Sequence, residues 1–392
     1  MRHFPRPGSS RYLGPFVVLL AALCLSLPLS AQTLTVLHTF QSRPDGLTPV
    51  AAVIMDENDT LYGTTARGGM ASQGTVYKLE SNGDESVLHS FVRRPDGLGP
   101  EAGLVFDSAH NLYGTTEIGG SLGKGTIFKV EPDGTETILH DFSMNPALGA
   151  NPVAGLIFDN SSNLYGTAQN GGDQAQDGTV FKLTPAGDLI VLHAFNGRTS
   201  DGRNPMAKLF LDTAGNFYGT TYQGGTHNRG TVFEIDAGGT YRVVYRFAGG
   251  ADGKWPSAGV IIDITSGNLY GTTSQGGAHN GGTVFKIDPS GNETVVHSFG
   301  ARGDGQFPQA DLVTDGAGNI YGTTVMGGAS QQGTVFKIDT AGNYSVLHSF
   351  RMREGVMPGA AVIIGNDGNL YGTTSAGGPG NGSGTVFKLS LQ

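Results

Sequence analysis

Residues 102–142 read AGLVFDSAHNLYGTTEIGGSLGKGTIFKVEPDGTETILHDF, and this stretch decides the fold. It contains four short runs of aliphatic, β-branched and aromatic residues, separated by turns rich in Gly, Asp, Asn and Pro. Such runs predict strands joined by tight turns, here over residues 102–107, 112–116, 126–130 and 137–142, and nothing in the stretch has a helical period. Four consecutive antiparallel strands form one blade of a β-propeller.

The same pattern recurs along the chain. The tripeptide Tyr-Gly-Thr returns at intervals of 51, 52, 53, 52, 51 and 50 residues. A repeat of about 50 residues is typical of propellers and solenoids. Its seven copies begin at Tyr62, Tyr113, Tyr165, Tyr218, Tyr270, Tyr321 and Tyr371.

The two ends of the repeat region favour a closed ring. Residues 34–40, LTVLHTF, match the fourth strand of a repeat with nothing before them, and the last repeat stops after its third strand, residues 384–389. The N-terminal strand can therefore complete the last blade, which removes the unpaired edges. An open solenoid would need atypical capping repeats, and the sequence contains none. We expect an all-β, seven-bladed β-propeller of four antiparallel strands per blade.

The repeat also resembles a known family. The motifs Asn-Leu-Tyr-Gly-Thr-Thr, Gly-Gly, Gly-Thr-Val-Phe-Lys and Val-Leu-His-Ser-Phe are similar to the Gly-rich tandem repeat called GloVer (Gloeo/Verruco repeat), over nearly all of residues 34–389. The resemblance implies an exported bacterial protein and brings no catalytic residues with it. Anchored members of the family carry a sorting tail, whereas Leu391 and Gln392 directly follow the last strand. Kelch repeats have a similar length but contain a tryptophan in each copy, whereas Trp255 is the only tryptophan in this chain.

The first 31 residues predict a secretory signal peptide. Three arginines precede an apolar run at residues 16–27, and small residues follow up to Ala31. We expect cleavage after Ala31 and a single domain over residues 32–392, located outside the cell or in the cell envelope; an uncleaved anchor is the alternative. Cys24 follows Leu23 rather than a small residue, so we do not expect lipidation.

Cleavage would change the composition of the chain. It removes three arginines and leaves 21 basic against 33 acidic residues, a net charge of −12. An acidic protein is not expected to bind nucleic acid or an anionic membrane, and without the signal peptide nothing predicts membrane insertion. The only cysteine is lost as well, so neither a disulfide nor thiol chemistry is expected.

Residues present in every repeat are most simply explained by the architecture. This applies to the Gly pairs between the second and third strands, which allow positive φ and close backbone approach. It applies to a series on the fourth strand: His38, His89, His140, His193, Tyr245, His297 and His348. It also applies to acidic residues in the loops that follow, where an Asp before Gly fixes a turn: Asp45, Asp96, Asp201, Asp252, Asp304 and Glu354, with Leu148 breaking the series.

We expect no metal on the histidines of this series. The fourth strand is the outermost one, about 14 Å from the first strand, so its side chains cannot converge across the ring. Arg302-Gly303-Asp304 resembles a cell-adhesion tripeptide but belongs to the repeated acidic series, and we interpret it as coincidence.

Positions where one repeat departs from the others are better candidates for a site. Immediately before the loop proline stand Thr48, Gly99, Asn151, Asn204, Trp255, Phe307 and Met357, of which the last three are large and apolar. Loops between the second and third strands add Tyr222, His227 and His279. Exposed aromatic rings beside polar groups form stacking surfaces for sugars and other flat ligands, so these six residues predict a ligand-binding arc. In the alternative interpretation Trp255 and Phe307 plug the mouth of the ring.

Two further candidates face the central channel. Three residues after the loop proline come Ala52, Gly103, Gly155, Lys208, Gly259, Asp311 and Ala361. Lys208 and Asp311 interrupt this ring of small residues, and they could contact a ligand or form a water-bridged structural pair.

These observations favour a noncatalytic function. We expect a secreted or cell-surface monomer that binds a glycan or a protein, with no cofactor and no metal. A polysaccharide lyase or hydrolase using carboxylates with His227 or His279 is one alternative, and a structural envelope protein is another. No P-loop, HExxH, GxSxG or Asp-x-Asp-x-Asp calcium motif is present in the sequence.

Overall fold

The computed structural model describes Met1, His3 and residues 32–41, 43–92, 95–142, 146–172 and 176–391. The chain divides into two compact units, Met1–Ala31 with Gln392, and Gln32–Leu391. The predicted signal peptide, with Cys24 and its cleavage site, lies outside the described residues apart from Met1 and His3. No helix in the described ranges is long and apolar enough to span a membrane.

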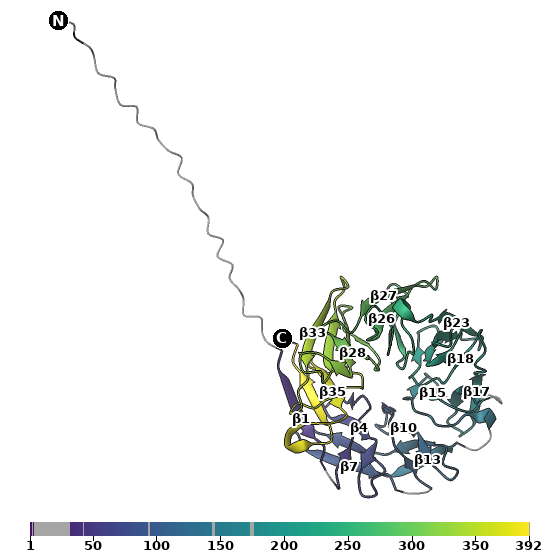
Figure 1. Ribbon diagram of the computed structural model, residues 1–392. Coiled ribbons are helices and arrows are strands. Elements are labelled where there is room, and N and C mark those ends of the chain that lie inside the picture. The colour runs from purple at the N-terminus through teal and green to yellow at the C-terminus, as the bar shows by residue number, and fades with distance from the viewer. Residues whose placement is uncertain are drawn as a thin grey trace. The chain divides into compact units, whose positions relative to one another are not determined.

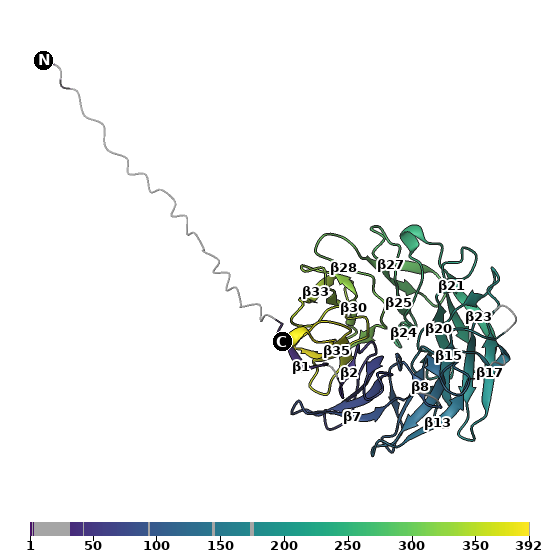
Figure 2. The same ribbon diagram turned by 60° about the horizontal axis from the view of Figure 1, so that its bottom comes forward.

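Residues 32–391 form seven four-stranded antiparallel sheets arranged as a ring, as Figures 1 and 2 show from two directions. From the channel outward the first three blades are β3 (Ile54–Met55), β4 (Leu61–Thr65), β6 (Thr75–Leu79), β7 (Glu85–Ser90); β9 (Val105–Phe106), β10 (Leu112–Thr116), β12 (Thr126–Val130), β13 (Glu136–Asp141); and β14 (Ile157–Phe158), β15 (Leu164–Ala168), β16 (Thr179–Leu183), β17 (Leu189–Ala194). The next three are β19 (Phe210–Leu211), β20 (Phe217–Thr221), β22 (Thr231–Ile235), β23 (Tyr241–Arg246); β24 (Val260–Ile262), β25 (Leu269–Thr273), β26 (Thr283–Ile287), β27 (Glu293–Ser298); and β29 (Val313–Thr314), β30 (Ile320–Thr324), β32 (Thr334–Ile338), β33 (Tyr344–Ser349). The seventh is β34 (Ile363–Ile364), β35 (Leu370–Thr374), β36 (Thr385–Leu389) and β1 (Leu34–Thr39).

The seventh sheet confirms the predicted closure. Strand β1 pairs antiparallel with β36, with Leu34 opposite Leu389 and Thr39 opposite Thr385. The first and last parts of the repeat region thus share one blade, and the outer edge of β36 is paired.

The loops contain a small second layer of pairing that the sequence did not predict. In four blades the loop before the first strand pairs with the loop after the second strand: β2 (Gly46–Leu47) with β5 (Arg67–Gly68), β8 (Gly97–Leu98) with β11 (Ile118–Gly119), β18 (Gly202–Arg203) with β21 (Gln223–Gly224), and β28 (Gly305–Gln306) with β31 (Met326–Gly327). In the other three a single bridge does the same: Ala150 with Asn170, Lys254 with Gln275, and Val356 with Ala376. The described parts of the loops also contain three short 3-10 helices: η1 (Pro146–Leu148), η2 (Gly250–Asp252) and η3 (Pro379–Asn381).

The Tyr-Gly-Thr motif has a contact for each residue. In the second blade the hydroxyl of Tyr113 donates to Asp107 at 2.9 Å and fastens the turn between the first two strands. Gly114 leaves room for the ring of Phe128 on the next strand, because a Cβ at this glycine would lie 2.6 Å from the ring's Cζ.

The threonine of the motif ties neighbouring blades together. Thr115 donates to the carbonyl of Ala154 in the following blade at 3.1 Å. The same bond recurs around the ring, and Thr373 closes the series by donating to Ala51 at 3.0 Å. The other five pairs are Thr64 with Ala102, Thr167 with Ala207, Thr220 with Ala258, Thr272 with Ala310, and Thr323 with Ala360.

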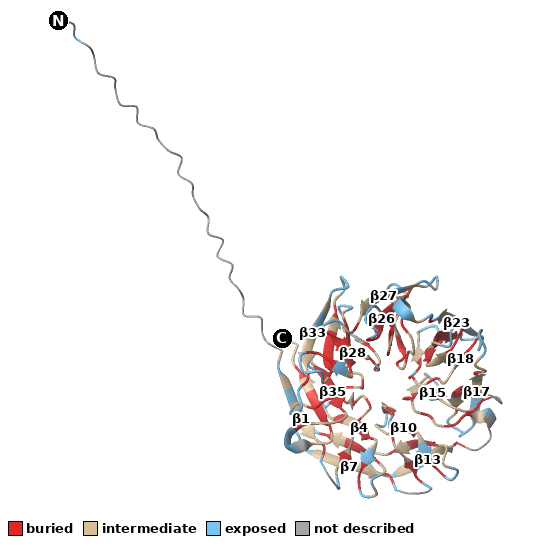
Figure 3. Cartoon of the chain, viewed as in Figure 1, coloured by how far each residue is buried: buried red, intermediate tan, exposed pale blue. Residues whose placement is uncertain are grey.

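The core lies between the blades. Each fourth strand is followed by a phenylalanine that is 0–1% exposed: Phe40, Phe91, Phe142, Phe195, Phe247, Phe299 and Phe350. Each ring meets an aromatic ring on the third strand of the next blade edge to face; the Phe91 and Phe128 centroids, for example, lie 5.1 Å apart. Figure 3 shows the resulting pattern: the second and third strands are largely buried, the fourth strands are of intermediate burial, and exposed residues gather in the turns. Phe40 of the N-terminal strand makes the same contact with Tyr77 at 5.0 Å, so closure is made by side chains as well as by backbone.

Candidate functional site

The outer ends of the blade junctions hold the repeated histidines and acids, which form two separate series in the sequence. The structure pairs them: Nε2 of His89 lies 3.2 Å from Oδ2 of Asp96. The equivalent pairs are His38–Asp45 at 3.2 Å, His193–Asp201 at 3.3 Å, His297–Asp304 at 3.0 Å, His348–Glu354 at 3.0 Å and Tyr245–Asp252 at 2.9 Å. Where Leu148 replaces the acid, Nε2 of His140 is buried without a partner among the described residues, and burial lowers the pKa of this histidine.

A third residue joins two of these pairs. Glu85 lies with His38 and Asp45, and Glu136 lies with His89 and Asp96, with ligand atoms within 4.8 Å of one another in each group. These are the two groups in the described part of the chain that could hold a metal ion.

The residue before the loop proline adopts a left-handed backbone in every blade. Its φ is 60° at Thr48, 63° at Gly99, 56° at Asn151, 53° at Asn204, 60° at Trp255, 59° at Phe307 and 56° at Met357. Hydrogen bonds fix this conformation on both sides: the Trp255 N–H donates to the Arg229 carbonyl at 2.8 Å, and the Trp255 carbonyl accepts from the Ser274 N–H at 3.1 Å. Gly and Asn adopt positive φ readily, but a bulky side chain there is strained. The blade fixes the backbone at this position and leaves the side chain free to differ.

Trp255 and Tyr222, predicted from different loops, lie together. Their rings are nearly parallel, with an interplanar angle of 25° and centroids 5.9 Å apart. Two cations adjoin the indole: Nζ of Lys254 lies 4.6 Å and Cζ of Arg229 lies 5.5 Å from its centroid. Both rings are partly exposed, so this surface is available to solvent.

The other members of the predicted arc are separate from this pair. Phe307 is partly buried, Met357 is 37% exposed, and His227 and His279 are exposed. Among the described residues, none of these three rings makes a ring contact with Trp255 or Tyr222. The structure therefore groups two of the six arc residues closely.

A cavity of about 390 Å³ opens beside Tyr222. It is lined by Gln169, Asn204, Met206, Tyr222, Gln223, Ser257, Ser274 and Gln309. We call this cavity together with Trp255 the rim pocket. The amide and hydroxyl side chains of this pocket were not predicted from the sequence. The position after the loop proline could have indicated them, because its residue type differs from blade to blade. Its seven residues are Val50, Glu101, Val153, Met206, Ser257, Gln309 and Gly359.

Lys208 and Asp311 both line the central channel, a cavity of about 320 Å³. Asp311 accepts the Gly259 N–H at 2.6 Å, and Cδ of Lys208 comes within 3.6 Å of where a Cβ on Gly155 would be. Each side chain thus leans over a glycine of the preceding blade, and no ion pair joins the two within the described ranges. Burial raises the pKa of Asp311, against the opposing effects of the Gly259 N–H and the Lys208 ammonium.

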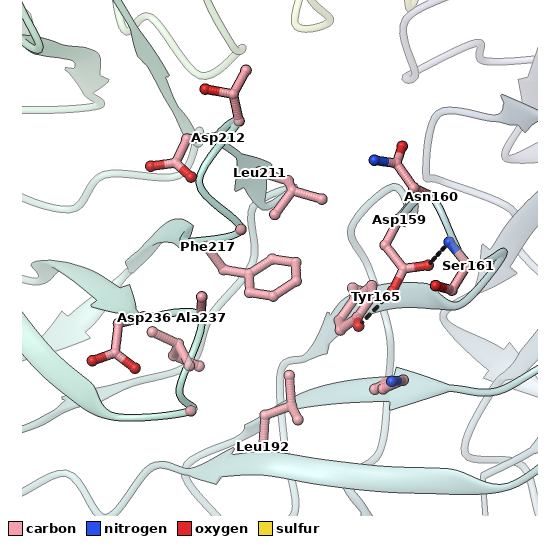
Figure 4. Close-up of a pocket in the computed structure, with 15 residues that line it drawn as sticks. Asp159, Asn160, Ser161, Tyr165, Leu192, Leu211, Asp212, Phe217, Asp236 and Ala237 are labelled. Atoms are coloured by element: carbon pink, nitrogen blue, oxygen red, sulfur yellow. Dashed lines mark hydrogen bonds between the residues drawn. The ribbon is translucent and has the colours of Figure 1, made fainter.

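A larger cavity, of about 610 Å³, lies on turns between the third and fourth blades (Figure 4). Its prominent polar contacts are internal to a turn: Asp159 accepts the Ser161 N–H at 2.8 Å and the Tyr165 hydroxyl at 2.9 Å. Asp107 and Asp315 make the same bonds in other blades, so these contacts belong to the repeat.

Solved structures share this architecture at low sequence identity. Two are extracellular domains of proposed hybrid two-component systems from B. thetaiotaomicron, with TM-scores of 0.61 and 0.58, at 10% and 14% identity over 91% and 92% of this chain. This chain covers 39% and 41% of their lengths. A proposed 6-phosphogluconolactonase from Bacteroides uniformis has a TM-score of 0.54 at 15% identity, over 81% of this chain and 88% of its own. These likenesses establish the fold alone.

No curated protein matches the sequence. The Gloeobacter/Verrucomicrobia repeat family matches residues 23–213 and 155–387, which agrees with the resemblance in the motifs. With the repeat present in all seven blades, this chain belongs to the Gloeobacter/Verrucomicrobia repeat family.

Proposed function

We propose that the protein is an exported, noncatalytic propeller that binds a carbohydrate chain in the rim pocket. The observation that carries the proposal is the partly exposed, nearly parallel pair of Trp255 and Tyr222 beside a cavity lined by amides and hydroxyls. A sugar presents an apolar face and a rim of hydroxyl groups. Aromatic rings match the face, and amide and hydroxyl side chains match the rim.

The charge around the indole narrows the ligand class. Lys254 and Arg229 flank Trp255, although the protein as a whole is acidic. Local cations in an acidic protein favour a ligand with its own negative charge. We therefore expect saccharides that carry carboxylate groups to bind more tightly than neutral ones.

Export is part of the proposal and rests on two supports. The first 31 residues have the composition of a signal peptide, and propellers of similar fold occur in extracellular sensor domains. A lyase, hydrolase or lactonase is the alternative, in which the channel carboxylates Glu101 and Asp311 would act on the ligand. A purely structural envelope role would leave the rim pocket unexplained.

The test is a glycan array followed by titration of the best oligosaccharide. Trp255 is the only tryptophan, so stacking on it should change the intrinsic fluorescence directly. Trp255→Asn should weaken binding about fivefold to tenfold, because one stacked ring contributes on the order of 1 kcal/mol.

The matched control is Thr48→Asn. Thr48 has the same φ of 60° and the same place before a loop proline, but in the first blade. Asn occupies this position in two other blades, so neither variant should disturb the backbone. Equal binding by the two variants, or an array without any glycan signal, would refute the proposal; capture of a protein ligand instead would replace it.

A further inference from the structure

Two blade junctions bring together three potential metal ligands from different strands. At the junction of the seventh and first blades, His38 comes from β1, Asp45 from the following loop and Glu85 from β7. One junction further, His89, Asp96 and Glu136 repeat the arrangement.

At each junction the histidine pairs with the aspartate, and the glutamate carboxylate is left without a hydrogen-bond partner in the described part of the chain. Oε1 of Glu85 and Oε1 of Glu136 are buried with no hydrogen-bond partner among the described residues. Burial and the adjacent aspartate raise the pKa of each glutamate to about 7, against the smaller opposing effect of the histidine. A buried carboxylate oxygen without a partner is unfavourable, and a bound cation would relieve both the burial and the repulsion.

The donor set and its spacing suit a divalent transition-metal ion. One imidazole nitrogen and two carboxylate oxygens are ligands that zinc accepts at about 2.0–2.2 Å, with water in the fourth position. Ligands around such an ion are separated by a little over 3 Å, and Nε2 of His38 already lies 3.2 Å from Oδ2 of Asp45. Backbone N–H groups of Gln41 and Gly46 hold this aspartate in place, at 3.0 and 2.6 Å.

We propose that the His38–Asp45–Glu85 and His89–Asp96–Glu136 junctions each bind one zinc-like divalent ion that clamps neighbouring blades together. This departs from the expectation drawn from the sequence. Histidines of different blades are too far apart to share an ion across the ring, whereas a glutamate of the next blade reaches each histidine–aspartate pair.

The remaining junctions serve as natural controls, because each lacks a member of the set. Tyr241 occupies the glutamate position at His193 and stacks on it with centroids 3.6 Å apart, and Tyr344 does the same at His297 at 3.7 Å. Leu189 and Leu34 stand at this position in two other blades, and the last has Glu293 but a tyrosine in place of histidine. The usual zinc ligands are Cys, His, Asp and Glu, so neither a leucine nor a tyrosine, whose hydroxyl at Tyr241 already donates to Asp201 at 2.7 Å, completes the set.

The experiment is a titration of the chelator-treated protein with Zn²⁺ by calorimetry. We expect the unaltered protein to bind two Zn²⁺ ions. Glu85→Gln and Glu136→Gln should each bind one ion, and the double variant should bind none. Glu293→Gln is the matched control and should keep both sites. Co²⁺ should give absorption bands that disappear in the double variant, a readout that loss of packing alone would not produce.

A gain of binding provides the stricter test. Tyr241→Glu supplies the missing carboxylate to His193 and Asp201 and should raise the stoichiometry to three. No Zn²⁺ binding by the unaltered protein, or full binding by the double glutamine variant, would overturn the proposal. Neither result affects the rim pocket, which lies in other loops.

Discussion

The N-terminal strand should contribute to stability as much as any internal strand, and Phe40→Ala tests this. Phe40 is fully buried, and its ring packs edge to face on Tyr77 of the first blade at 5.0 Å. It also contacts the ring of His38 at 4.8 Å. The side chain is thus the aromatic part of the seam that closes the ring.

The expected magnitude follows from burial. Truncation of a fully buried phenylalanine to alanine costs about 3–5 kcal/mol, from lost transfer free energy and the cavity left behind. Phe91→Ala is the matched control, because Phe91 is equally buried and contacts Phe128 at 5.1 Å and His89 at 4.8 Å within an internal junction of the same type. We expect the two variants to lose similar free energies of unfolding.

Urea unfolding followed by the fluorescence of the single tryptophan measures both variants against the unaltered protein. A loss below about 1 kcal/mol for Phe40→Ala, with the full loss for Phe91→Ala, would mean that the strand does not close the ring. Repeating the measurement at several protein concentrations excludes exchange of the strand between two copies, because an exchanged dimer would become less stable on dilution.

Three further predictions concern the scaffold. Deletion of residues 32–41 should leave β36 as an exposed edge and produce aggregation or a lower Tm, measured by light scattering and thermal melting; an equally stable monomer would contradict this. Burial and a neighbouring aspartate raise the pKa of Glu293 from 4.5 to about 7, so the folded state holds this proton more tightly than the unfolded chain. The free energy of unfolding should therefore fall between about pH 4.5 and 7, by roughly 1 kcal/mol after solvent screening, and Glu293→Gln should abolish this part of the decline in urea titrations at pH 5 and 8. Gly271→Ala places a Cβ 2.6 Å from Cζ of Phe285 and should cost about 1–3 kcal/mol in the same assay, whereas Gly316→Ala, with nothing within 4 Å, should have little effect.

The sequence was sufficient for the architecture because each blade is a local unit. Its strands follow one another along the chain, so the period, the strand pattern and the missing fourth strand predicted seven blades and their closure. The first strand was expected over residues 102–107, but β9 spans only Val105–Phe106, and the carbonyl of Ala102 accepts the Thr64 hydroxyl of the preceding blade. The short strand pairs in the loops were not predicted, because each strand is two residues long and one of the two is glycine.

The site was harder to predict because its members come from different repeats. The pairing of Tyr222 with Trp255 depends on how two loops approach in space, which spacing along the chain does not reveal. The same holds for Glu85, which reaches a histidine of the preceding blade. Lys208 and Asp311 line the cavity at the channel, and each lies over a glycine of the preceding blade, a contact that the sequence does not reveal.

The residue before the loop proline has the same left-handed backbone in every blade. The large side chains of Trp255, Phe307 and Met357 at this position therefore indicate a role other than forming the turn. The backbone there is fixed by hydrogen bonds that recur in each blade, so these side chains are not needed to form the turn. Glycine at Gly99 and asparagine at Asn151 satisfy the same backbone with less strain. A bulky residue at positive φ costs about 1–2 kcal/mol, so three in consecutive blades cost several kcal/mol that Gly99, Asn151 and Asn204 avoid; Thr48 of the first blade is strained in the same way. The fold does not require this strain, and it is concentrated on one arc of the ring that includes the stacked indole. Selection for a binding surface would account for it.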